Sequence, residues 1–326
     1  MTATSIDGLV STIIPVHNRA GLLREAVGSV LAQRYRPIEV VIVDDGSTDA
    51  TAAAADALAA AHPGEVQVVH QANAGPGSAR ETGRRRAKGE FIQYLDSDDL
   101  LLPDKFALQV AGLRGDPHCG VAYGYTRHRD AEGRLDAQPW KGSGTRVETM
   151  FPSFLRSRWW DTPTPLYRAA VCAAAGPWTD LRLEEDWEYD CRIAALGTRL
   201  HFCAVFVAEV RDHGSDRLGR GEALQPSRLV QRARAHSLIH AHAVRAGIDA
   251  SAPEMQHFAR ELFLLARQCG AAGLGTQSRD LFRLARAASG PHRASRLDFR
   301  LYAMAAAVLG WPLAGRLACA SDRLRR

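Results

Sequence analysis

The stretch "GEFIQYLDSDDLLLPDKF", residues 89–106, runs from mostly apolar residues straight into three carboxylates. Its first part, "EFIQYL", is short and apolar and follows a glycine, which predicts a buried strand. Asp96, Asp98 and Asp99 then stand within four residues, where their negative charges repel one another unless something compensates them. The acidic cluster is therefore expected directly after the end of a strand, and its charge needs an explanation.

The chain around this stretch alternates between strand-like and helix-like segments. The runs "LVSTIIPV", "IEVVIVDDGS" and "VQVVHQ" precede it as further strands, separated by segments of helical spacing. Strands that alternate with helices predict an α/β fold with a mostly parallel, Rossmann-like sheet flanked by helices on both faces. Such sheets bind ligands at the carboxyl ends of their strands. The pairs Asp44–Asp45 and Asp96–Asp99 both fall at such ends.

The local helix signals make two detailed predictions. Asn18 is a plausible N-cap for the helix that follows the first strand. Ser78 and Glu81 have the spacing of a capping box and predict a helix that continues to about residue 86.

The pattern changes after residue 120. Another strand is expected in "CGVAYGY", long loops over residues 127–165, a short helix in "LEEDWEYDCRIAALG" and a strand in "LHFCAVFVAEVRDHGSD". From about residue 225 the chain reads as Ala- and Arg-rich helices. The sequence therefore predicts a catalytic-type α/β domain over residues 1–222 and an all-helical C-terminal extension over residues 223–326.

Composition narrows the class of protein. The 326 residues are 46% hydrophobic and 24% charged, and the six cysteines are scattered without a CxxC pair. A disulfide framework or a zinc site is not expected, and a reducing cytoplasm is the default location. The N-terminal stretch lacks the features of a signal peptide, and no run of about 18 uncharged apolar residues is present. The apolar run that comes nearest, residues 301–315, contains a Gly-Trp-Pro break.

Net charge is uneven along the chain. It is +5 overall, but residues 223–326 carry 16 Arg and 6 acidic residues, whereas residues 1–222 carry a net charge of −5. A basic C-terminal part fits either a solvated Arg-rich face or an anionic neighbour such as a membrane surface. Its amphipathic segments would then either pack on the protein or lie on anionic lipid.

The acidic cluster has two interpretations. One Asp at a strand end often caps a helix or closes a turn, and Asp98 or Asp99 could do so. Three carboxylates exceed that need. Hard divalent cations such as Mn²⁺ or Mg²⁺ bind one or two carboxylates and complete their coordination with phosphate oxygens. This interpretation predicts a metal ion that carries a diphosphate.

Three separated segments now resemble a known family. "STIIPVHNRAGLLREAVGSVLAQRYRPIEVVIVDDGSTD", "NAGPGSARETGRRRAKGEFIQYLDSDD" and "LEEDWEYDCRIAALG" are similar to the motifs of family 2 glycosyltransferases with the GT-A fold. The resemblance covers roughly residues 8–215 and does not reach the C-terminal helices. It implies an inverting, metal-dependent enzyme that uses a nucleoside-diphosphate sugar.

The resemblance also assigns roles to residues. His17 stands where the family usually has Tyr or Phe, and "RDHGSD" is similar to a segment whose His approaches the metal. The resemblance implies a nucleotide pocket lined by Pro15, Val16, His17 and Asn18, contacts of Asp44 and Asp45 to the base and ribose, and passage of the nucleotide by the segment from Asn73 to Arg80, with Arg80 near the phosphates. It also implies a DxD-type motif at Asp96, Ser97 and Asp98, with Asp96 at the ribose or sugar, Asp98 on the metal, and His213 as a further metal ligand. The implied catalytic base is the pair Glu185–Asp186, with Glu184 as a nearby rival.

The expected reaction moves one sugar to a hydroxyl acceptor, with Asp186 as general base. The acceptor would be a glycan, a lipid-linked sugar or a glycosylated small molecule. A nucleotide-sugar-binding protein without activity is one alternative. A nucleotidyltransferase is another, but "PVHNRAG" lacks the Gly-rich basic loop expected there. A nicotinamide enzyme is disfavoured because Arg80 stands where the dinucleotide fingerprint needs Gly. No nucleic acid partner is expected, and the sequence leaves the oligomeric state open.

Two further features allow two interpretations each. His236, His240 and His242 fall on one helical stretch, where zinc binding is less expected than solvated or capping histidines. In "RSRWWDTP" the adjacent Trp159 and Trp160 could stack on an acceptor sugar or pack in a loop, and both cannot face inward from one element. Trp187 is expected to be partly packed.

Overall fold

The computed structural model describes residues 5–212 and 224–324, and the chain divides into two compact units. Unit 1 comprises Met1–Met150, Arg158–Asp180 and Leu196–Ser215. Unit 2 comprises Phe151–Ser157, Leu181–Ala195 and Asp216–Arg326. The chain therefore passes between the two units more than once, and the functional boundary predicted near residue 222 stays a prediction.

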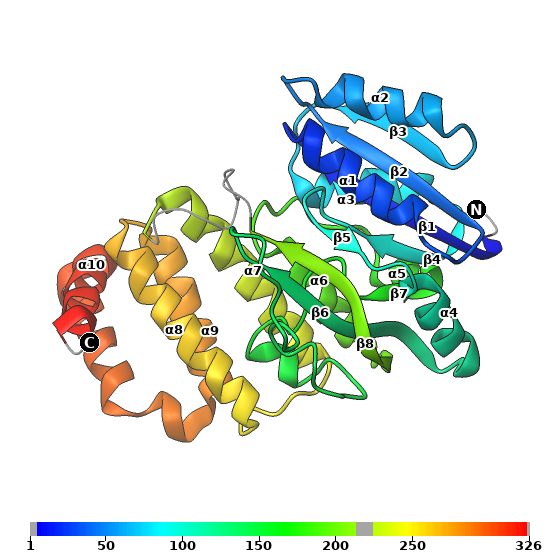
Figure 1. Cartoon of the computed structure of the whole chain (residues 1–326). Helices are drawn as coiled ribbons and strands as arrows, with labels where there is room; N and C mark the ends of the chain where they lie inside the picture. The colour runs from blue at the N-terminus through cyan, green and yellow to red at the C-terminus, as the bar shows by residue number, and fades with distance from the viewer. Residues whose placement is uncertain (1–4, 213–223, 325–326) are drawn as a thin grey trace. The chain divides into compact units, whose positions relative to one another are not determined.

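Unit 1 is built on one mixed sheet of eight strands in the order β3-β2-β1-β4-β7-β6-β8-β5. Figure 1 shows the sheet with helices packed against it. The strands are β1 (Ile6–Val16), β2 (Ile38–Asp45), β3 (Val66–Gln71), β4 (Gly89–Tyr94), β5 (Leu100–Leu101), β6 (Cys119–Arg129), β7 (Leu166–Arg168) and β8 (Arg199–Arg211). The expected α/β fold with a mostly parallel sheet is confirmed.

The first four strands form the parallel half of the sheet. β1 pairs in parallel with β2 and with β4, and β2 pairs in parallel with β3. The register places Val16 beside Asp44 and Asp45 beside Gln71. Because parallel strands end at the same edge, the residues that follow all four strands meet there. The acidic residues of β2 and those after β4 therefore belong to one edge of the sheet.

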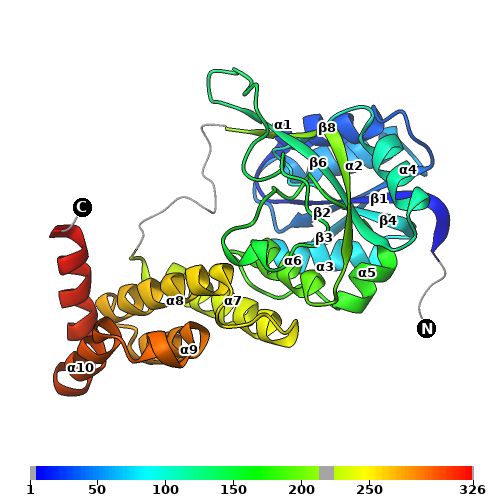
Figure 2. The same ribbon diagram turned by 90° about the horizontal axis from the view of Figure 1, so that it is seen from below.

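Helices cover both faces of this sheet. They are α1 (Ala20–Leu31), α2 (Thr51–Ala61), α3 (Pro76–Arg86), α4 (Lys105–Gly115) and α5 (Ala169–Ala175). Figure 2 shows α1 and α4 on one side of the strands and α3 and α5 on the other. Buried side chains of α1 and α4 join β1 and β2 in the main apolar core. On the opposite face α3 approaches so closely that a Cβ on Gly83 would stand 2.4 Å from Ile13.

Both helix-start predictions are wrong in detail. α1 begins at Ala20, and Asn18 instead adopts a left-handed conformation with φ of 52°. α3 begins at Pro76 after Gly75, so Ser78 lies inside the helix and forms no capping box. Proline at the first helical position already has the right φ and lacks an N–H that would need a partner. Glu81 is consequently available to bind Arg84 at 2.8 Å.

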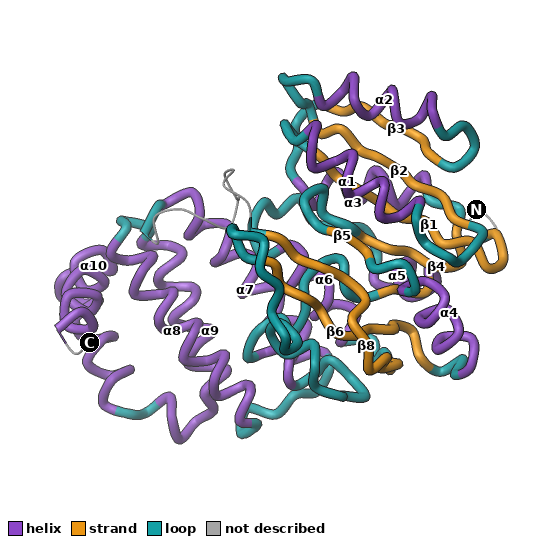
Figure 3. The backbone as a smooth tube through the Cα atoms, viewed as in Figure 1, coloured by secondary structure: helices purple, strands orange, loops and turns teal. Residues whose placement is uncertain are grey.

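Unit 2 contains no strand among its described residues and is helical, as Figure 3 shows by colour. Its elements are the 3-10 helix η1 (Ser153–Leu155), α6 (Glu185–Ala194), α7 (Pro226–Arg245), α8 (Pro253–Ala271), α9 (Gly275–Ala294) and α10 (Leu297–Leu324). Short connections at residues 246–252 and 272–274 separate α7, α8 and α9. An aromatic cluster that includes Phe263, Phe282 and Tyr302 packs α8, α9 and α10 together.

One helix of the described residues is long and apolar enough to cross a membrane by length and composition, Leu297–Asp322 of α10. Only 17% of its most apolar window is buried within the protein. The backbone is interrupted at Gly310, with φ of 77°, and Pro312 follows inside the helix. The Gly-Trp-Pro break in the sequence thus bends α10 into two segments.

Candidate functional site

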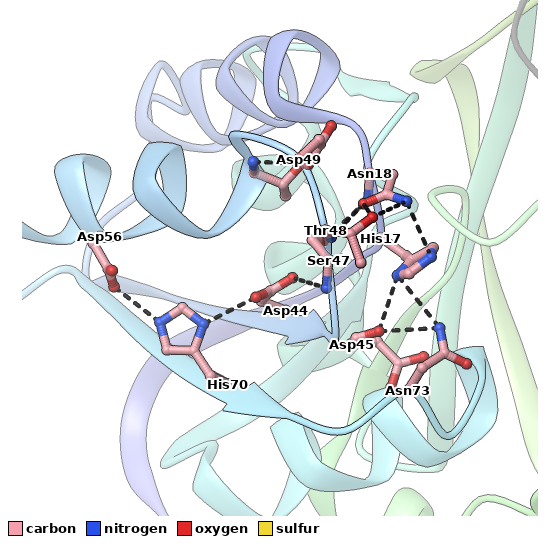
Figure 4. A network of polar contacts seen from close by, with 11 residues as sticks. His17, Asn18, Asp44, Asp45, Ser47, Thr48, Asp49, Asp56, His70 and Asn73 are labelled. Atoms are coloured by element: carbon pink, nitrogen blue, oxygen red, sulfur yellow. Dashed lines mark hydrogen bonds and ion pairs between the residues drawn. The ribbon is translucent and has the colours of Figure 1, made fainter.

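The loops after β1, β2 and β3 are joined by a network of polar contacts, which Figure 4 shows from close by. The Asn18 side-chain oxygen accepts a hydrogen bond from the Thr48 N–H at 2.8 Å, and the Asn18 N–H donates to Ser47 Oγ at 3.0 Å. His17 Nδ1 lies 3.0 Å from the backbone oxygen of Asp45, which also accepts a bond from Asn73 Nδ2 at 3.1 Å. His17, Asn18, Asp45 and Asn73, four of the residues predicted to lie at the nucleotide, are thus brought together at the carboxyl edge of the sheet.

Asp45 uses its carboxylate inside the protein. One oxygen accepts hydrogen bonds from Gln71 Nε2 at 2.7 Å and from the Ala74 N–H at 2.8 Å, and the other accepts from the Gly75 N–H at 2.8 Å. Asp45 therefore fixes the loop that begins α3 to the end of β2. This geometry gives Asp45 a structural role in the loop, whereas the resemblance implies a contact to base or ribose, which stays a prediction.

Asp44 forms a second branch of the network with His70 on β3. Its carboxylate accepts a hydrogen bond from the Ser47 N–H at 3.1 Å and lies 3.0 Å from His70 Nδ1, while His70 Nε2 lies 3.0 Å from Asp56. Burial alone would raise the pKa of Asp44, but hydrogen bonds from Ser47 and His70 outweigh it and hold that pKa below its usual value. The same bonds to Asp44 and Asp56 raise the pKa of His70.

Pro15 and Val16 end β1 beside this network. Pro15 is half-buried, and the Val16 side chain belongs to the apolar core. The pocket-lining role predicted for Val16 is therefore one for its backbone, because its side chain is already packed.

The acidic cluster after β4 is compensated in part by arginines. Arg80 Nη2 donates to Asp96 at 2.7 Å, and its guanidinium lies 4.9 Å from the centre of the Trp178 ring. Arg19 Nη1 contacts the Asp98 carboxylate at 2.5 Å. Arg80, predicted to lie near the phosphates, thus contacts the DxD-type motif, and two guanidinium groups compensate part of the negative charge of the cluster.

Asp99 lies in surroundings that disfavour the charged form of its carboxyl group. Burial raises the pKa of its carboxyl well above the usual value, and the neighbouring carboxylates of Asp98, Asp96 and Asp161 raise it further. A hydrogen bond from the Arg211 N–H to Asp99, at 3.3 Å, acts in the opposite direction. Burial and the neighbouring carboxylates together therefore oppose ionisation of Asp99.

Sequence reasoning missed three residues at the cluster. Arg19 follows the predicted pocket residues directly, so its position was a usable signal. Arg211, whose Nε donates to the Asp98 backbone oxygen at 2.7 Å, and Asp161 come from distant parts of the chain. No local pattern marks these two, because only folding brings them to the end of β4.

The cluster fits a divalent cation in its donor chemistry. The side chains of Asp96, Asp98 and Asp99 offer carboxylate oxygens, the donors that Mn²⁺ and Mg²⁺ prefer. Across residues 5–212 and 224–324, no group of three His, Cys, Asp or Glu side chains is arranged to hold an ion. The protein would supply one or two ligands, and a bound diphosphate would supply others. The predicted ligand His213 lies outside the described residues.

The predicted catalytic carboxylates Glu185 and Asp186 begin α6 in unit 2. Glu185 is buried and Asp186 half-buried, and acidic residues in a first helical turn interact favourably with the helix dipole. Glu184, just before them, has a left-handed backbone with φ of 60°. Its carboxylate contacts Arg232 at 2.9 Å and His236 at 3.0 Å on α7. Glu184 is thus engaged in joining two helices, and the assignment of the base to the pair Glu185–Asp186 stays a prediction.

A second carboxylate–histidine pair lies one turn further along α6. Glu188 contacts Nε2 of His242 at 2.8 Å and Arg192 at 2.7 Å. The expectation of solvated or capping histidines on α7 is wrong for His236 and His242, because both are buried against glutamates of α6. His240 is also buried, and burial lowers its pKa.

The tryptophans are arranged largely as expected. Trp160 is fully buried and Trp159 is not, so adjacent tryptophans do face different ways. Trp187 is half-buried, and its indole N–H donates to the Phe154 backbone oxygen at 2.8 Å. Partial packing of Trp187 is therefore confirmed.

The mostly parallel sheet, with polar clusters at its carboxyl edge and helices appended in unit 2, defines a GT-A type α/β fold. The fold of this chain is similar to that of S. aureus TarS 1-349, solved in complex with UDP-GlcNAc, with a TM-score of 0.70 at 19% identity over 97% of this chain and 92% of that one. It is also similar to a mannosyltransferase from Pyrobaculum calidifontis, solved with GDP-Man and Mn2+, with a TM-score of 0.53 at 22% identity over 97% of this chain and 86% of that one.

The sequence profile described as "Glycosyl transferase family 2" matches residues 11–173. The chain belongs to this family, and its fold is that of a glycosyltransferase. Over 127 residues it is 40% identical to a chondroitin synthase from Escherichia coli, a match that covers 39% of this chain and 18% of that protein. The chain spans only 14 to 35% of the length of the curated glycosyltransferases compared.

Proposed function

We propose that this protein transfers one sugar from a nucleoside-diphosphate sugar to a hydroxyl acceptor. The observation that carries the proposal is the meeting of two polar clusters at one edge of the sheet, one around Asp44 and Asp45 and one around Asp96 and Asp98. Structures of the same fold hold UDP-GlcNAc in one case and GDP-Man with Mn2+ in the other, which supports a nucleotide-sugar donor and a divalent cation.

The residues after β1, β2 and β3 would bind the nucleoside. Asp44 has a depressed pKa, so its carboxylate stays ionised near neutral pH and can accept a hydrogen bond from a base or a ribose hydroxyl. His17 and Asn18 are exposed beside it and present ring and amide groups to a ligand. Asn73 is exposed on the other side of the network and would mark the passage of the nucleotide towards Arg80.

Charge on the diphosphate would be met by residues at the end of β4. Arg80 is held by Asp96 and by the face of Trp178, so its guanidinium is already oriented. Arg19 lies against Asp98 and could turn towards a phosphate when that carboxylate takes another partner. A Mn²⁺ or Mg²⁺ ion held by Asp98 and Asp96 would act as a Lewis acid for the departing diphosphate. Ser97, between them, is buried and would fix the spacing of the two carboxylates.

The acceptor hydroxyl must lose a proton as it attacks the sugar, which requires a general base. We assign this role to Asp186, with Glu185 beside it, because this pair begins α6 as the Glu-Asp pair of family 2 glycosyltransferases begins a helix. One displacement by one activated hydroxyl inverts the anomeric carbon. The acceptor class proposed is a glycan, a lipid-linked sugar or a glycosylated small molecule, and the proposed location is the cytoplasm, with contact to the inner face of the membrane.

Donor identity can be tested by thermal unfolding with UDP-, GDP- and dTDP-sugars in the presence of Mn²⁺ or Mg²⁺. A ligand that binds only the folded state at 100 times its Kd stabilises that state by about 2.7 kcal/mol. The Asp98→Asn variant should lose the metal-dependent part of the shift, whereas Asp104→Asn, an exposed residue paired with Arg34, should keep it. No shift with any donor in the wild-type protein would contradict the proposal.

The base can be tested separately from donor binding. Asp186→Asn should lower the rate of sugar transfer or donor hydrolysis by a factor of about 10² to 10⁴, while nucleotide binding persists. Glu185→Gln should show whether the neighbouring carboxylate shares the role, and Asp280→Asn, at an exposed position of α9, serves as the control. A protein that binds nucleotide sugars with no turnover in the wild type would be a binding protein, and the assigned reaction would be wrong.

A further inference from the structure

The two segments of α10 are each too short to cross a bilayer. The interruption at Gly310 separates residues 297–309 from residues 311–324. At 1.5 Å per residue each segment is about 20 Å long, whereas the hydrocarbon core of a bilayer is about 30 Å thick. The composition of α10 suits lipid, but its bent geometry suits a helix that lies along a surface.

The first segment buries one face in unit 2. Phe299, Tyr302 and Ala306 are buried, and Phe299 stacks on Phe263 of α8 with ring centres 4.5 Å apart. Successive helical residues turn by 100°, so these three side chains share one side of the segment. This side is the one that holds α10 in the fold.

The opposite side of the segment is apolar and exposed. Leu297, Leu301, Met304 and Val308 have exposed fractions of 68%, 50%, 59% and 81%. Their spacing of four, three and four residues places them within about 60° of arc, facing away from the buried side. In the second segment Leu313 and Leu317 are exposed at 44% and 54%. We call these six residues the apolar stripe. The exposed faces of helices in soluble proteins are usually polar, so this apolar stripe is expected to contact another molecule.

Charge around the stripe identifies that molecule. Residues 275–324 contain eight Arg and three Asp, with no Lys or Glu. Two of these acids already have partners, since Asp280 contacts Arg279 and Asp322 contacts Arg267. The surface therefore carries an excess of positive charge.

Three of the arginines lie close to the stripe in sequence. Arg296 and Arg300 are exposed beside its beginning, and Arg316 is exposed beside Leu317. An apolar face bordered by arginines matches the interface of an anionic bilayer, where acyl chains lie below phosphate groups. A second copy of the chain docked through the same stripe would bring equal charges together.

We propose that α10 binds the surface of an anionic membrane, with the apolar stripe inserted at the boundary between headgroups and acyl chains and Arg296, Arg300 and Arg316 at the phosphates. This inference stands apart from the proposed transferase reaction, because it uses only α10 and its neighbours in unit 2. It goes beyond a general affinity of the basic C-terminal part, since it assigns the contact to six apolar side chains on one helix.

The test is flotation of the full chain with phosphatidylcholine vesicles that contain or lack phosphatidylglycerol, at low and high salt. The wild-type protein should float with the anionic vesicles at low salt, float less at high salt, and stay in solution with neutral vesicles. The double variant Leu301→Glu with Val308→Glu should lose at least about tenfold in bound fraction. Val244→Glu changes an equally exposed apolar residue of α7, at 57%, and should bind as the wild type does.

Three results would overturn the proposal. The first is no flotation of the wild type at low salt, and the second is equal flotation of the double variant and the wild type. The third is a wild-type dimer in analytical ultracentrifugation that becomes a monomer in the double variant, which would assign the stripe to a second copy. Circular dichroism establishes that the double variant is folded. Nucleotide-dependent thermal shifts measure the donor site independently, so failure of one proposal is distinguishable from failure of the other.

Discussion

Replacement of Glu188 by alanine tests how α6 is held in place. The Glu188 carboxylate is 1% exposed, and it contacts His242 at 2.8 Å and Arg192 at 2.7 Å. Its removal leaves the guanidinium of Arg192, only 13% exposed, without the carboxylate beside it. Breaking a buried pair by removing one partner typically destabilises a protein by about 3–5 kcal/mol. The melting temperature should fall on the order of 10 °C, since each kcal/mol shifts a domain of moderate size by about 2–4 °C.

The assay is thermal and urea unfolding of three proteins side by side. Glu188→Gln keeps the side-chain volume and removes the charge. Comparison with Glu188→Ala therefore separates the stability lost with the charge from the stability lost through the cavity that alanine leaves. Glu132→Ala removes a carboxylate that is 65% exposed and lies 3.0 Å from Arg134, and it should change stability by at most about 1 kcal/mol. If Glu188→Ala and Glu132→Ala lose equal stability, the pair on α6 does not hold the helix as described.

The pH dependence provides a second measurement on the same variant. Burial alone would raise the pKa of Glu188, but the hydrogen bonds from His242 and Arg192 hold it below the usual value of 4.5. A lowered folded-state pKa means that the stabilisation is complete above pH 4.5 and is lost as the pH falls through the folded pKa. The difference in stability between the wild type and Glu188→Ala should therefore narrow in acid. A constant difference would contradict the charge argument.

Two further predictions concern unit 1. Gly83→Ala should destabilise the protein by about 1–3 kcal/mol in urea unfolding, because the new Cβ would stand 2.4 Å from Ile13. The control Gly28→Ala in α1 meets nothing within 4 Å and should stabilise the protein by up to about 1 kcal/mol. Equal effects of the two substitutions would refute the close approach of α3. His70 should titrate by NMR above its usual pKa of 6.5, and the stability that His70 adds relative to His70→Asn should be present below pH 6.5 and disappear as the pH rises through the folded pKa. Its size should stay below about 1 kcal/mol because the side chain is 45% exposed, and a titration at or below 6.5 would contradict the contact with Asp44.

The parallel half of the sheet could be predicted from the sequence because its strands are short, apolar and rich in β-branched residues. "LVSTIIPV" and "IEVVIVDD" became β1 and β2 with nearly the expected bounds. The expected positions of Asp44 and Asp96 at strand ends followed from this pattern and from the rule that parallel strands end together. Local periodicity was enough here, since burial on both faces leaves few alternatives for such segments.

Contacts between distant residues were beyond local reasoning. The bond from Arg211 to Asp98 joins residues 113 positions apart, and Glu188 meets His242 across 54 positions. Solvation of the α7 histidines was predicted wrongly because periodicity cannot show that glutamates at the start of α6 would lie opposite His236 and His242. The helix start at Ser78 failed for another reason: Pro76 and Gly75 offered a stronger local signal than the spacing of Ser78 and Glu81.

The close approach of two loops at the sheet edge has a consequence for the kinetics of ligand association. Gly46 has φ of 71°, and a side chain there would stand 2.7 Å from the Asn73 backbone nitrogen, so the turn after β2 touches the backbone that follows β3. Asp45 fastens the next two peptide groups to the same turn. If the proposed nucleoside binds at this edge, these loops are already ordered before it arrives, and little entropy is lost in ordering them. The association rate constant at this edge should then depend on diffusion and on ionic strength. No slow ordering of these turns should precede binding.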